Sequence, residues 1–504
     1  MSLGSQKKAG QQPRPSSQVT DFGYSQAMQR GTRAFASFSV AFAFVSIATG
    51  IFTTYGAVLQ SSGPAGIWTW PLAVVGQLMV ALVFGSLAAR MPITGYSYQW
   101  MSRLANPLLG WMMGWISFTF LAVVVVAVDY TIASTVLPVM FSYSGSAGDA
   151  WAITAVVLLL QAMSVGFSTR WTERINNTAV SAELIGMVLL VVLLIVVGAL
   201  KHAFIPANLF STGSLPAGPE YLSFGSLTQV GPWMLGTLLG SFTIVGFESA
   251  ANLAEETKNP ARVVPRAMAL AVIASGVLGF LFLIAITLLA GDPVALAQSS
   301  TPVADVINHT LGPIVGDILL VLVVVAIFAC GMVILMSGVR LVWAMSRDAR
   351  FPGHQLFSQV SSKTGTPLAA TGLQLVVAEV ILALFALKTD ALFSLFSAAT
   401  LLPAVIYAAT VLLYIVKRHQ LPASQGFNLG KFEIPVLVLA AIWLIFELMI
   451  FRDASFKASW LYVLVMVLIG AIYLASLLLR KGRAGLEMPA ADTSGHQANQ
   501  DETP

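Results

Sequence analysis

Long apolar runs, separated by short polar segments, recur along almost the whole chain. A helix needs about 20 mainly apolar residues to cross a bilayer. The pattern therefore predicts an all-α polytopic membrane protein with twelve transmembrane helices. The expected spans lie near residues 34–60, 66–89, 108–138, 149–169, 178–200, 232–254, 266–290, 313–340, 367–387, 391–416, 432–451 and 458–479.

Two of the apolar runs are interrupted near their middle. The first contains SIATGIF at 46–52, and the sixth contains Gly246 followed two residues later by Glu248. Glycine weakens a helix, and an acid near the bilayer centre costs about 2.5–3.5 kcal/mol. Such residues are tolerated where a helix breaks and its free backbone groups line a cavity. Because both breaks fall at matching places in their runs, we expect two related halves with a binding site between them, as in secondary transporters.

The composition and the distribution of charge agree with a membrane protein. Hydrophobic residues make up 57% of the chain and charged residues only 10%, against about 25% charged residues in soluble proteins. If both termini are cytoplasmic, four of the 26 Lys and Arg residues face outward, namely Lys201, Lys388, Arg452 and Lys457. This asymmetry follows the positive-inside rule. We therefore expect a multi-pass protein of the plasma (inner) membrane with both termini in the cytoplasm.

Several other classes of protein are disfavoured. The single cysteine, Cys330, excludes a disulfide framework and a multi-cysteine metal site. The five histidines are scattered, and no HExxH, GxSxG or phosphate-binding motif is present, so we expect no enzyme activity. No cofactor, metal or nucleic-acid partner is expected either. A channel or a sensor on the same scaffold remains the alternative from a different class, although no ring of charge or added soluble domain supports it.

Acidic residues occur inside the expected spans, whereas no Lys or Arg lies deep in one. Such groups usually mark a substrate or proton pathway. Without basic partners they suit an ammonium group, a bound cation or a carboxyl that stays protonated. We expect Glu183 and Glu248 to bind protons, and Asp129 and Glu248 to contact a substrate amine. Glu379 is expected to form a hydrogen bond across helices, and Glu447 to reach the membrane interface.

An aromatic residue, Phe242, lies one helical turn before Gly246. In this position it can close over a ligand as a gate, or contact an ammonium group through a cation–π interaction. Packing in the core is the alternative.

These segments resemble the amino acid–polyamine–organocation superfamily. GFESAANLAEETKNPARVVPRA (246–267) is similar to its best-marked segment, and SIATGIF to its first broken helix. SRDARFPGHQLFSQVSSKTGTP (346–367) is similar to the loop after its eighth span. SSGPAGIWTWPLAVV and PITGYSYQW look most like the amino acid/choline branch, which includes 4-aminobutyrate permeases. The resemblance covers about residues 34–480.

The resemblance implies a LeuT-like fold, in which spans 1–5 and 6–10 form two inverted repeats. The transport core would cover residues 34–416 and two peripheral spans residues 432–480, between cytoplasmic tails at 1–33 and 481–504. The substrate would lie between broken spans 1 and 6, flanked by spans 3, 8 and 10. Related proteins occur as monomers and as homodimers, and both states remain open here.

The resemblance also implies roles for individual residues. A substrate carboxylate would meet the backbone amides of Ile47, Ala48, Thr49 and Gly50, and half-helix N-termini are suited to bind anions. The substrate amine would meet the carbonyls of Val245 and Gly246, with Phe242 as an aromatic gate and Glu248 as the acid linked to amine sensing or protons. Tyr98 matches a tyrosine at the inner mouth, although Tyr96 replaces a glycine of that pattern.

One departure from the family affects the coupling mechanism. Proton-coupled relatives often carry a lysine in the fifth span, and the alignment of NNTAVSAE (176–183) places Glu183 there. Glu183 would itself bind a proton or cation, or the protein would be an uncoupled exchanger; we favour proton coupling. The expected function is import of an amino acid or a 4-aminobutyrate-like amine by alternating access. The alternatives are an amino acid/amine exchanger and a polyamine or choline transporter.

The loop after the sixth span carries acids and bases close together. They are Glu255, Glu256, Lys258, Arg262 and Arg266. We expect these residues to pair within the loop, as a structural element or as a latch of the inner gate.

Overall fold

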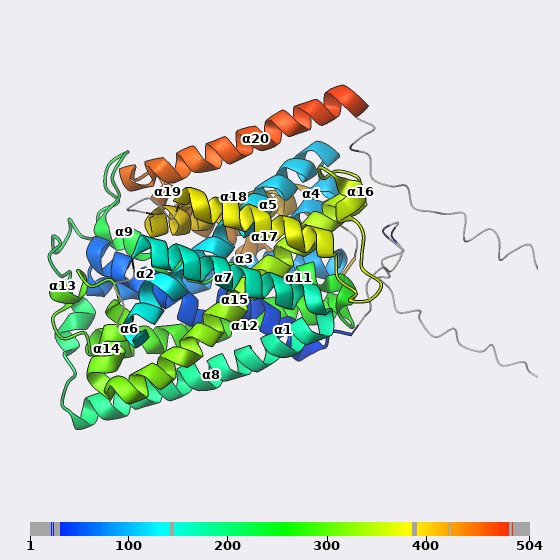
Figure 1. The fold of residues 1–504 in the computed structure, drawn as a ribbon. Coiled ribbons are helices and arrows are strands. Elements are labelled where there is room, and N and C mark those ends of the chain that lie inside the picture. Colours follow the sequence, from blue (N-terminus) through cyan, green and yellow to red (C-terminus); the bar gives the residue numbers. More distant parts are fainter. Residues whose placement is uncertain are drawn as a thin grey trace, which may run out of the picture.

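The computed structural model describes residues 22, 24, 31–141, 146–385, 391–421, 423–424, 426–482 and 486. This part of the chain is a bundle of helices (Figure 1), with an isolated extended bridge between Thr32 and Thr257. The all-α expectation is therefore confirmed. Most of the tails expected at 1–33 and 481–504 lies outside the described residues, and the division into core and tails stays a prediction.

Eleven helical segments of the described chain are long and apolar enough to cross a membrane. They are built from α1 (Ala34–Val45) with α2 (Ile47–Ser61), α3 (Thr69–Arg90), α5 (Pro107–Thr131), α7 (Ala147–Phe167), α8 (Thr169–Leu200), α12 (Pro260–Leu288), α15 (Pro313–Arg347), α17 (Leu368–Phe385), α18 (Ala391–Lys417), α19 (Glu433–Ile450) and α20 (Lys457–Lys481). The sixth expected span is divided into α9 (Pro232–Gly236), α10 (Leu238–Thr243) and α11 (Ser249–Asn252). A multi-pass architecture is confirmed. The number of spans reaches twelve only if this divided segment is counted as one of them.

The first expected span breaks at Ser46, between α1 and α2. α1 is followed by Ser46, whose N–H donates to the Phe42 carbonyl at 2.8 Å. The φ of Ser46 is 27°, which is outside the helical range and ends the helix. The Ser46 hydroxyl accepts the Thr49 N–H at 3.3 Å and so caps the start of α2. A serine at the break thus satisfies a backbone amide that the interruption leaves free.

The sixth expected span breaks between α10 and α11, where Gly246 has a φ of +84°. A Cβ at Gly246 would lie 1.8 Å from the ring of Phe44, so a side chain does not fit there. At Gly50, a Cβ would lie 2.1 Å from the Thr243 hydroxyl. Glycines in both spans therefore allow the two breaks to pack directly against each other.

The helices form two packed groups. One group contains α1, α3 and α12, and the other contains α5, α7, α15 and α17. α8 contacts both groups through α1 and α15, while α18 contacts α5, α3 and α19. Because α1 and α2 also contact α15 and α5, the break of the first span lies between the two groups.

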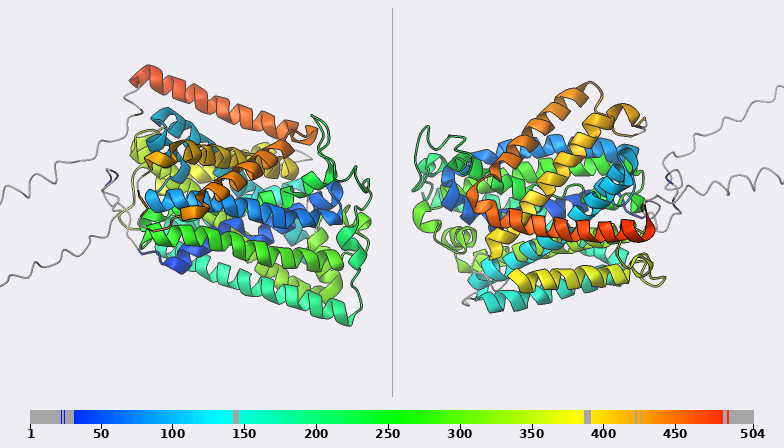
Figure 2. Two further views of the ribbon diagram at one scale, coloured as in Figure 1. Left: turned by 180° about the vertical axis from the view of Figure 1, so that it is seen from behind. Right: turned by 90° about the horizontal axis from the view of Figure 1, so that it is seen from above.

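α1 begins and α20 ends at the same end of the bundle (Figure 1). The short helices α4 (Tyr96–Leu104) and α16 (His354–Phe357) lie at this end, which we call the α4 end. α13 (Pro293–Leu296) and α14 (Pro302–Leu311) lie at the opposite, α14 end. α20 runs along the edge of the bundle (Figure 2). Its exposed apolar residues, such as Leu479 at 89%, suit contact with lipid.

Candidate functional site

A small cavity, of about 10 Å³, lies where the two breaks meet α5 and α15. Four of the residues expected at the substrate line it, namely Thr49, Gly50, Phe242 and Val245. The other lining residues are mainly apolar, and among the described residues that line it none has a charged side chain. The structure thus brings the two breaks together around a compact, uncharged site. The Ile47 side chain does not line this cavity and lies near Gly279 of α12, while its backbone amide, the group expected at the substrate, faces Glu183.

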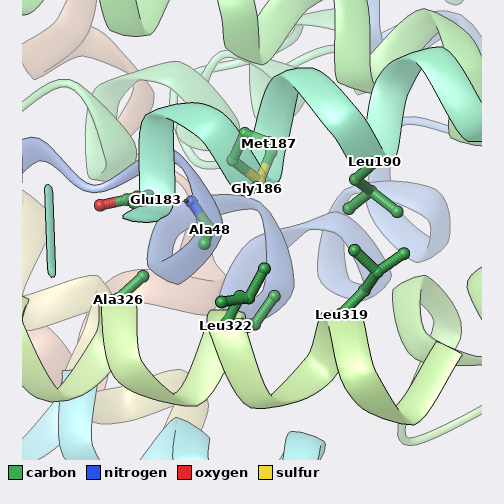
Figure 3. Close-up of a pocket in the computed structure, with 9 residues that line it drawn as sticks. Ala48, Glu183, Gly186, Met187, Leu190, Leu319, Leu322 and Ala326 are labelled. Carbon is green, nitrogen blue, oxygen red and sulfur yellow. Dashed lines mark hydrogen bonds between the residues drawn. The ribbon is translucent and has the colours of Figure 1, made fainter. Parts of the chain in front are cut away.

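The amides at the start of α2 are already hydrogen-bonded within the protein. Glu183 Oε1 accepts from the Ser46 hydroxyl at 3.0 Å and from the Ala48 N–H at 3.5 Å. The Thr49 N–H is held by Ser46 Oγ, and the Gly50 N–H donates to the Ser46 carbonyl at 3.0 Å. Figure 3 shows Glu183 beside Ala48, with α15 on the opposite side. An internal carboxylate therefore lies where a substrate carboxylate was expected to bind.

The rest of the surroundings of Glu183 is apolar. Its side chain is 2% exposed and borders a cavity of about 10 Å³, whose other lining side chains, such as Met187 and Leu322, are apolar. Its second oxygen, Oε2, has no hydrogen-bond partner among the residues that the structure describes. A carboxyl with one oxygen bonded and the other in apolar surroundings is suited to bind a proton.

Glu248 is linked to the break of the sixth span by Tyr407 of α18. The Tyr407 hydroxyl donates to Glu248 Oε2 at 2.6 Å and accepts the Gly246 N–H at 2.9 Å. The rings of Phe84 and Phe247 each lie 5.2 Å from the Tyr407 ring. Sequence reasoning missed Tyr407; a tyrosine in the middle of an apolar run was its only signal. The hydroxyl bridges the acid and the freed amide of the break.

Asp129 points away from the cavity between the breaks. Val124 and Val128, on the same helix, line that cavity, while Asp129 Oδ1 accepts from Gln161 of α7 at 2.8 Å. On the α15 side it meets Gly331, where a Cβ would lie 2.3 Å from Asp129 Oδ1. The structure therefore places the Asp129 side chain between α5, α7 and α15. It directly follows Val128, which lines the cavity, and so points to another side of α5.

Tyr98 belongs to a polar cluster at the α4 end. Its hydroxyl donates to Asp348 Oδ2 at 2.7 Å, and Gln99 Nε2 donates to the same oxygen at 3.0 Å. The Tyr24 hydroxyl donates to Asp348 Oδ1 at 2.9 Å, and the Arg347 guanidinium lies 3.8 Å from the Tyr24 ring centre. Burial, together with the Asp348 carboxylate, raises the pKa of Tyr98 well above its usual value, so its hydroxyl remains a donor.

Two ion pairs join the end of the sixth span to α15. Glu255 accepts two hydrogen bonds from Arg347, at 3.0 and 3.1 Å, and Glu256 pairs with Arg340 at 2.8 Å. Glu255 Oε1 also accepts the Thr94 N–H at 3.1 Å. The expectation that these acids pair within their own loop was therefore wrong: both reach arginines of α15. They do so because α15 continues to Arg347, seven residues beyond the expected end of this span.

One base and one acid are more buried than their places in the expected spans suggest. Arg340, the last residue of the expected eighth span, lies inside α15 and is 2% exposed. Glu447 does not reach the membrane interface: it is 1% exposed and accepts from Gln77 Nε2 of α3 at 3.2 Å. Glu379 is partly exposed on α17. The intramembrane acids thus differ sharply in their surroundings, which their sequence neighbours did not indicate.

Comparisons with known proteins agree with this architecture. A family model described as "Amino acid permease" matches residues 35–477. The chain is 26% identical to "Amino-acid permease BAT1" of Arabidopsis thaliana, over 85% of this chain and 86% of that protein. It is 24% identical to a "Putative polyamine transporter" of Candida albicans, over 82% of this chain and 76% of that protein. The resemblance to this superfamily is confirmed, and the chain belongs to the amino acid permease family.

Proposed function

We propose that the protein imports a small zwitterionic amine, an amino acid or a 4-aminobutyrate-like compound, by alternating access coupled to protons. The observation that carries the proposal is the position of Glu183, whose carboxylate is bonded to Ser46 and Ala48 at the break of the first span. The amides of this half-helix are the groups that best suit a substrate carboxylate. The Glu183 carboxylate and the substrate carboxylate therefore compete for the same backbone N–H groups at the start of α2.

This competition couples protons to substrate. A charged acceptor forms a hydrogen bond about twice as strong as a neutral one, so a proton on Glu183 weakens its hold on the Ala48 amide. The proton also removes a negative charge next to the incoming substrate carboxylate. Each ligand therefore favours binding of the other, and by linkage the effect is reciprocal. Proton and substrate then bind and leave together, as symport requires.

The substrate amine binds at the second break. The carbonyls of Val245 and Gly246 accept its hydrogen bonds, and Phe242 covers it from the cavity wall. The Gly246 carbonyl does so with its second lone pair, because it already accepts the Ser249 N–H at 2.9 Å. Glu248 acts on this region through Tyr407, which also holds the Gly246 amide. Because no charged side chain lines the described part of the cavity, a substrate with one amine and one carboxylate fits better than a polyamine.

The α4 end faces the cytoplasm of a plasma (inner) membrane in this proposal. The positive-inside distribution of Lys and Arg supports this orientation. The ion pairs of Glu255 and Glu256 with α15 then close the cytoplasmic side. Alternating access consists of parting the two helix groups first on one side of the breaks and then on the other.

Uptake into proteoliposomes tests the proposal. Labelled amino acids, 4-aminobutyrate, putrescine and choline are offered in sodium-free buffer, with and without an inward proton gradient. We expect accumulation of an amino acid or of 4-aminobutyrate only with the gradient. Uptake that requires substrate preloaded inside would identify an exchanger. Accumulation of putrescine alone would assign the protein to polyamine transport, the function named for the Candida relative.

A further inference from the structure

A third cavity, with several polar lining residues, lies beside α8 at the α4 end. It has a volume of about 20 Å³ and is bordered by α1, by α15, by the residues that follow α11 and by the first turns of α8. This volume is large enough to hold one water molecule. Its polar lining comes chiefly from Thr172, Glu173 and Asn176 of α8 and from Glu256.

Asn176 is the unusual member of this lining. Its side chain is 1% exposed, and neither Oδ1 nor Nδ2 has a hydrogen-bond partner among the described residues. Buried side-chain amides are bonded in the great majority of cases, to protein or to ordered water. A buried amide with both atoms free, facing a cavity of the size of a water molecule, indicates a site built for water.

The cavity lies on the same face of α8 as Glu183. Asn176 and Glu183 are seven residues apart, which is close to two helical turns and about 10 Å along the axis. Between them on this face are Ala179 and Val180, both buried and small. Glu173, one turn before Asn176, is only partly buried and lies at the outer side of the cavity. The face therefore presents Glu173 and Asn176 towards the α4 end and Glu183 further along, with the apolar pair Ala179 and Val180 between Asn176 and Glu183.

We infer that Glu173 and Asn176 form the route by which a proton passes between Glu183 and the cytoplasm. This inference rests on the proposed function, in which Glu183 binds the coupling proton. Once α1 has moved away from α8, water fills the space between Glu183 and Asn176. This water carries the proton from the Glu183 carboxyl to the water held at Asn176, which passes it to the Glu173 carboxylate for release to solvent. The amide of Asn176 holds that water through both its donor and its acceptor. Val180 and Ala179 keep the route closed until α1 moves away from α8.

Other ionisable groups lie near both ends of the route. At the Glu173 end are Glu256, which lines the same cavity, and its ion-pair partner Arg340 of α15. At the Glu183 end, Cys330 of α15 lies within electrostatic range of both Glu183 and Asp129. Glu256 is neutralised by Arg340, so Glu173 is the acid on this route that is free to exchange protons.

The test compares Asn176→Val with Asn177→Val, the same change one residue further round the helix. Two rates are measured in proteoliposomes: accumulation driven by a proton gradient, and exchange of labelled for unlabelled substrate at equal pH. Exchange does not require the proton to leave. We expect Asn176→Val to slow accumulation at least about tenfold and to leave exchange within about twofold. Asn177→Val should change neither rate.

Two further variants make the result decisive. Asn176→Ser, which retains a group able to bind water, should restore most of the accumulation. In the Glu183→Gln background, Asn176→Val should have no additional effect. Equal loss of accumulation and exchange in Asn176→Val, or loss of neither, would overturn the inference while leaving the proposed function intact. A wild-type protein without gradient-driven accumulation would instead refute the proposed function itself.

Discussion

In the proposed function, the charge of Glu183 controls access of the substrate to the amides at the start of α2. The carboxylate accepts from Ser46 at 3.0 Å and lies 3.5 Å from the Ala48 nitrogen. We expect Glu183→Gln to abolish gradient-driven accumulation and to spare exchange, because glutamine keeps an acceptor at this point but cannot bind the proton. Both activities are measured in proteoliposomes with the same labelled substrate. Unchanged accumulation would show that Glu183 is not the coupling group.

Asp129 is a second buried acid, and its side chain does not line the cavity between the breaks. In Asp129→Asn the side chain keeps the hydrogen bond from Gln161, and its new N–H₂ group can donate to Gln161 Oε1, which has no partner in the described structure. We therefore expect uptake within about twofold of wild type. Asp129→Leu should lower the free energy of unfolding by about 1–3 kcal/mol, because it removes one of the two acceptors of the buried Gln161 Nε2. The other acceptor, the Phe328 carbonyl at 3.1 Å, remains. A selective loss of substrate affinity in Asp129→Asn would instead return Asp129 to the substrate site.

The sequence indicated that Asp129, Glu183 and Glu248 lie inside the bundle, but not what each one contacts. Glu248 was recognised from its place beside Gly246, yet its partner Tyr407 lies 159 residues away on α18. Asp129 and Glu183 are both acids in apolar runs, and only the packing of α7, α2 and α15 separates their roles. Contacts of this kind depend on which helix faces which, and no local pattern encodes them.

At the scale of helices, the break of the sixth span depends on Gly246. Its φ of +84° and the approach of Phe44 leave no room for a side chain. We expect Gly246→Ala to lower substrate affinity by at least about tenfold, since the break must shift by more than an ångström to admit a methyl group. Affinity is measured as substrate-induced thermal stabilisation of the purified protein.

Gly372→Ala serves as the control for this change. Gly372 lies in α17, and a Cβ there would meet no atom within 4 Å. This substitution should leave affinity unchanged and stabilise the helix by about 0.5–1 kcal/mol. Normal affinity in Gly246→Ala would contradict the proposal that the break forms the binding site.

The two breaks were predictable because their residues are poor helix formers in an apolar setting. The lengths of the elements were less predictable. α15 extends to Arg347 because the residues after the expected end, LVWAMSR, continue a helix that is buried by neighbouring elements. The sixth span reads as one apolar run, whereas its backbone is divided among α9, α10 and α11. Hydropathy reports burial in lipid or protein and does not distinguish a helix from an unwound segment.

For the molecule as a whole, the pairs at the α4 end hold the two helix groups together. Arg347 connects α15 to Glu255 through two hydrogen bonds, and Glu255 also holds the backbone of Thr94. Breaking a buried ion pair costs about 3–5 kcal/mol, and each 1.4 kcal/mol changes a conformational equilibrium about tenfold. We therefore expect Arg347→Gln to favour the state that is open to the cytoplasm.

Accessibility of a buried reporter measures this shift. Cys330 is the only cysteine of the chain, so Cys330→Ala provides a background for a single cysteine at Ser97, which is 1% exposed at the α4 end. A charged thiol reagent applied from the cytoplasmic side should label this cysteine at least about tenfold faster when Arg347→Gln is present. Arg418→Gln, a partly exposed arginine that donates to His419, should leave the rate unchanged. Equal labelling in both variants would mean that other contacts, such as Tyr24 with Asp348, keep the cytoplasmic side closed.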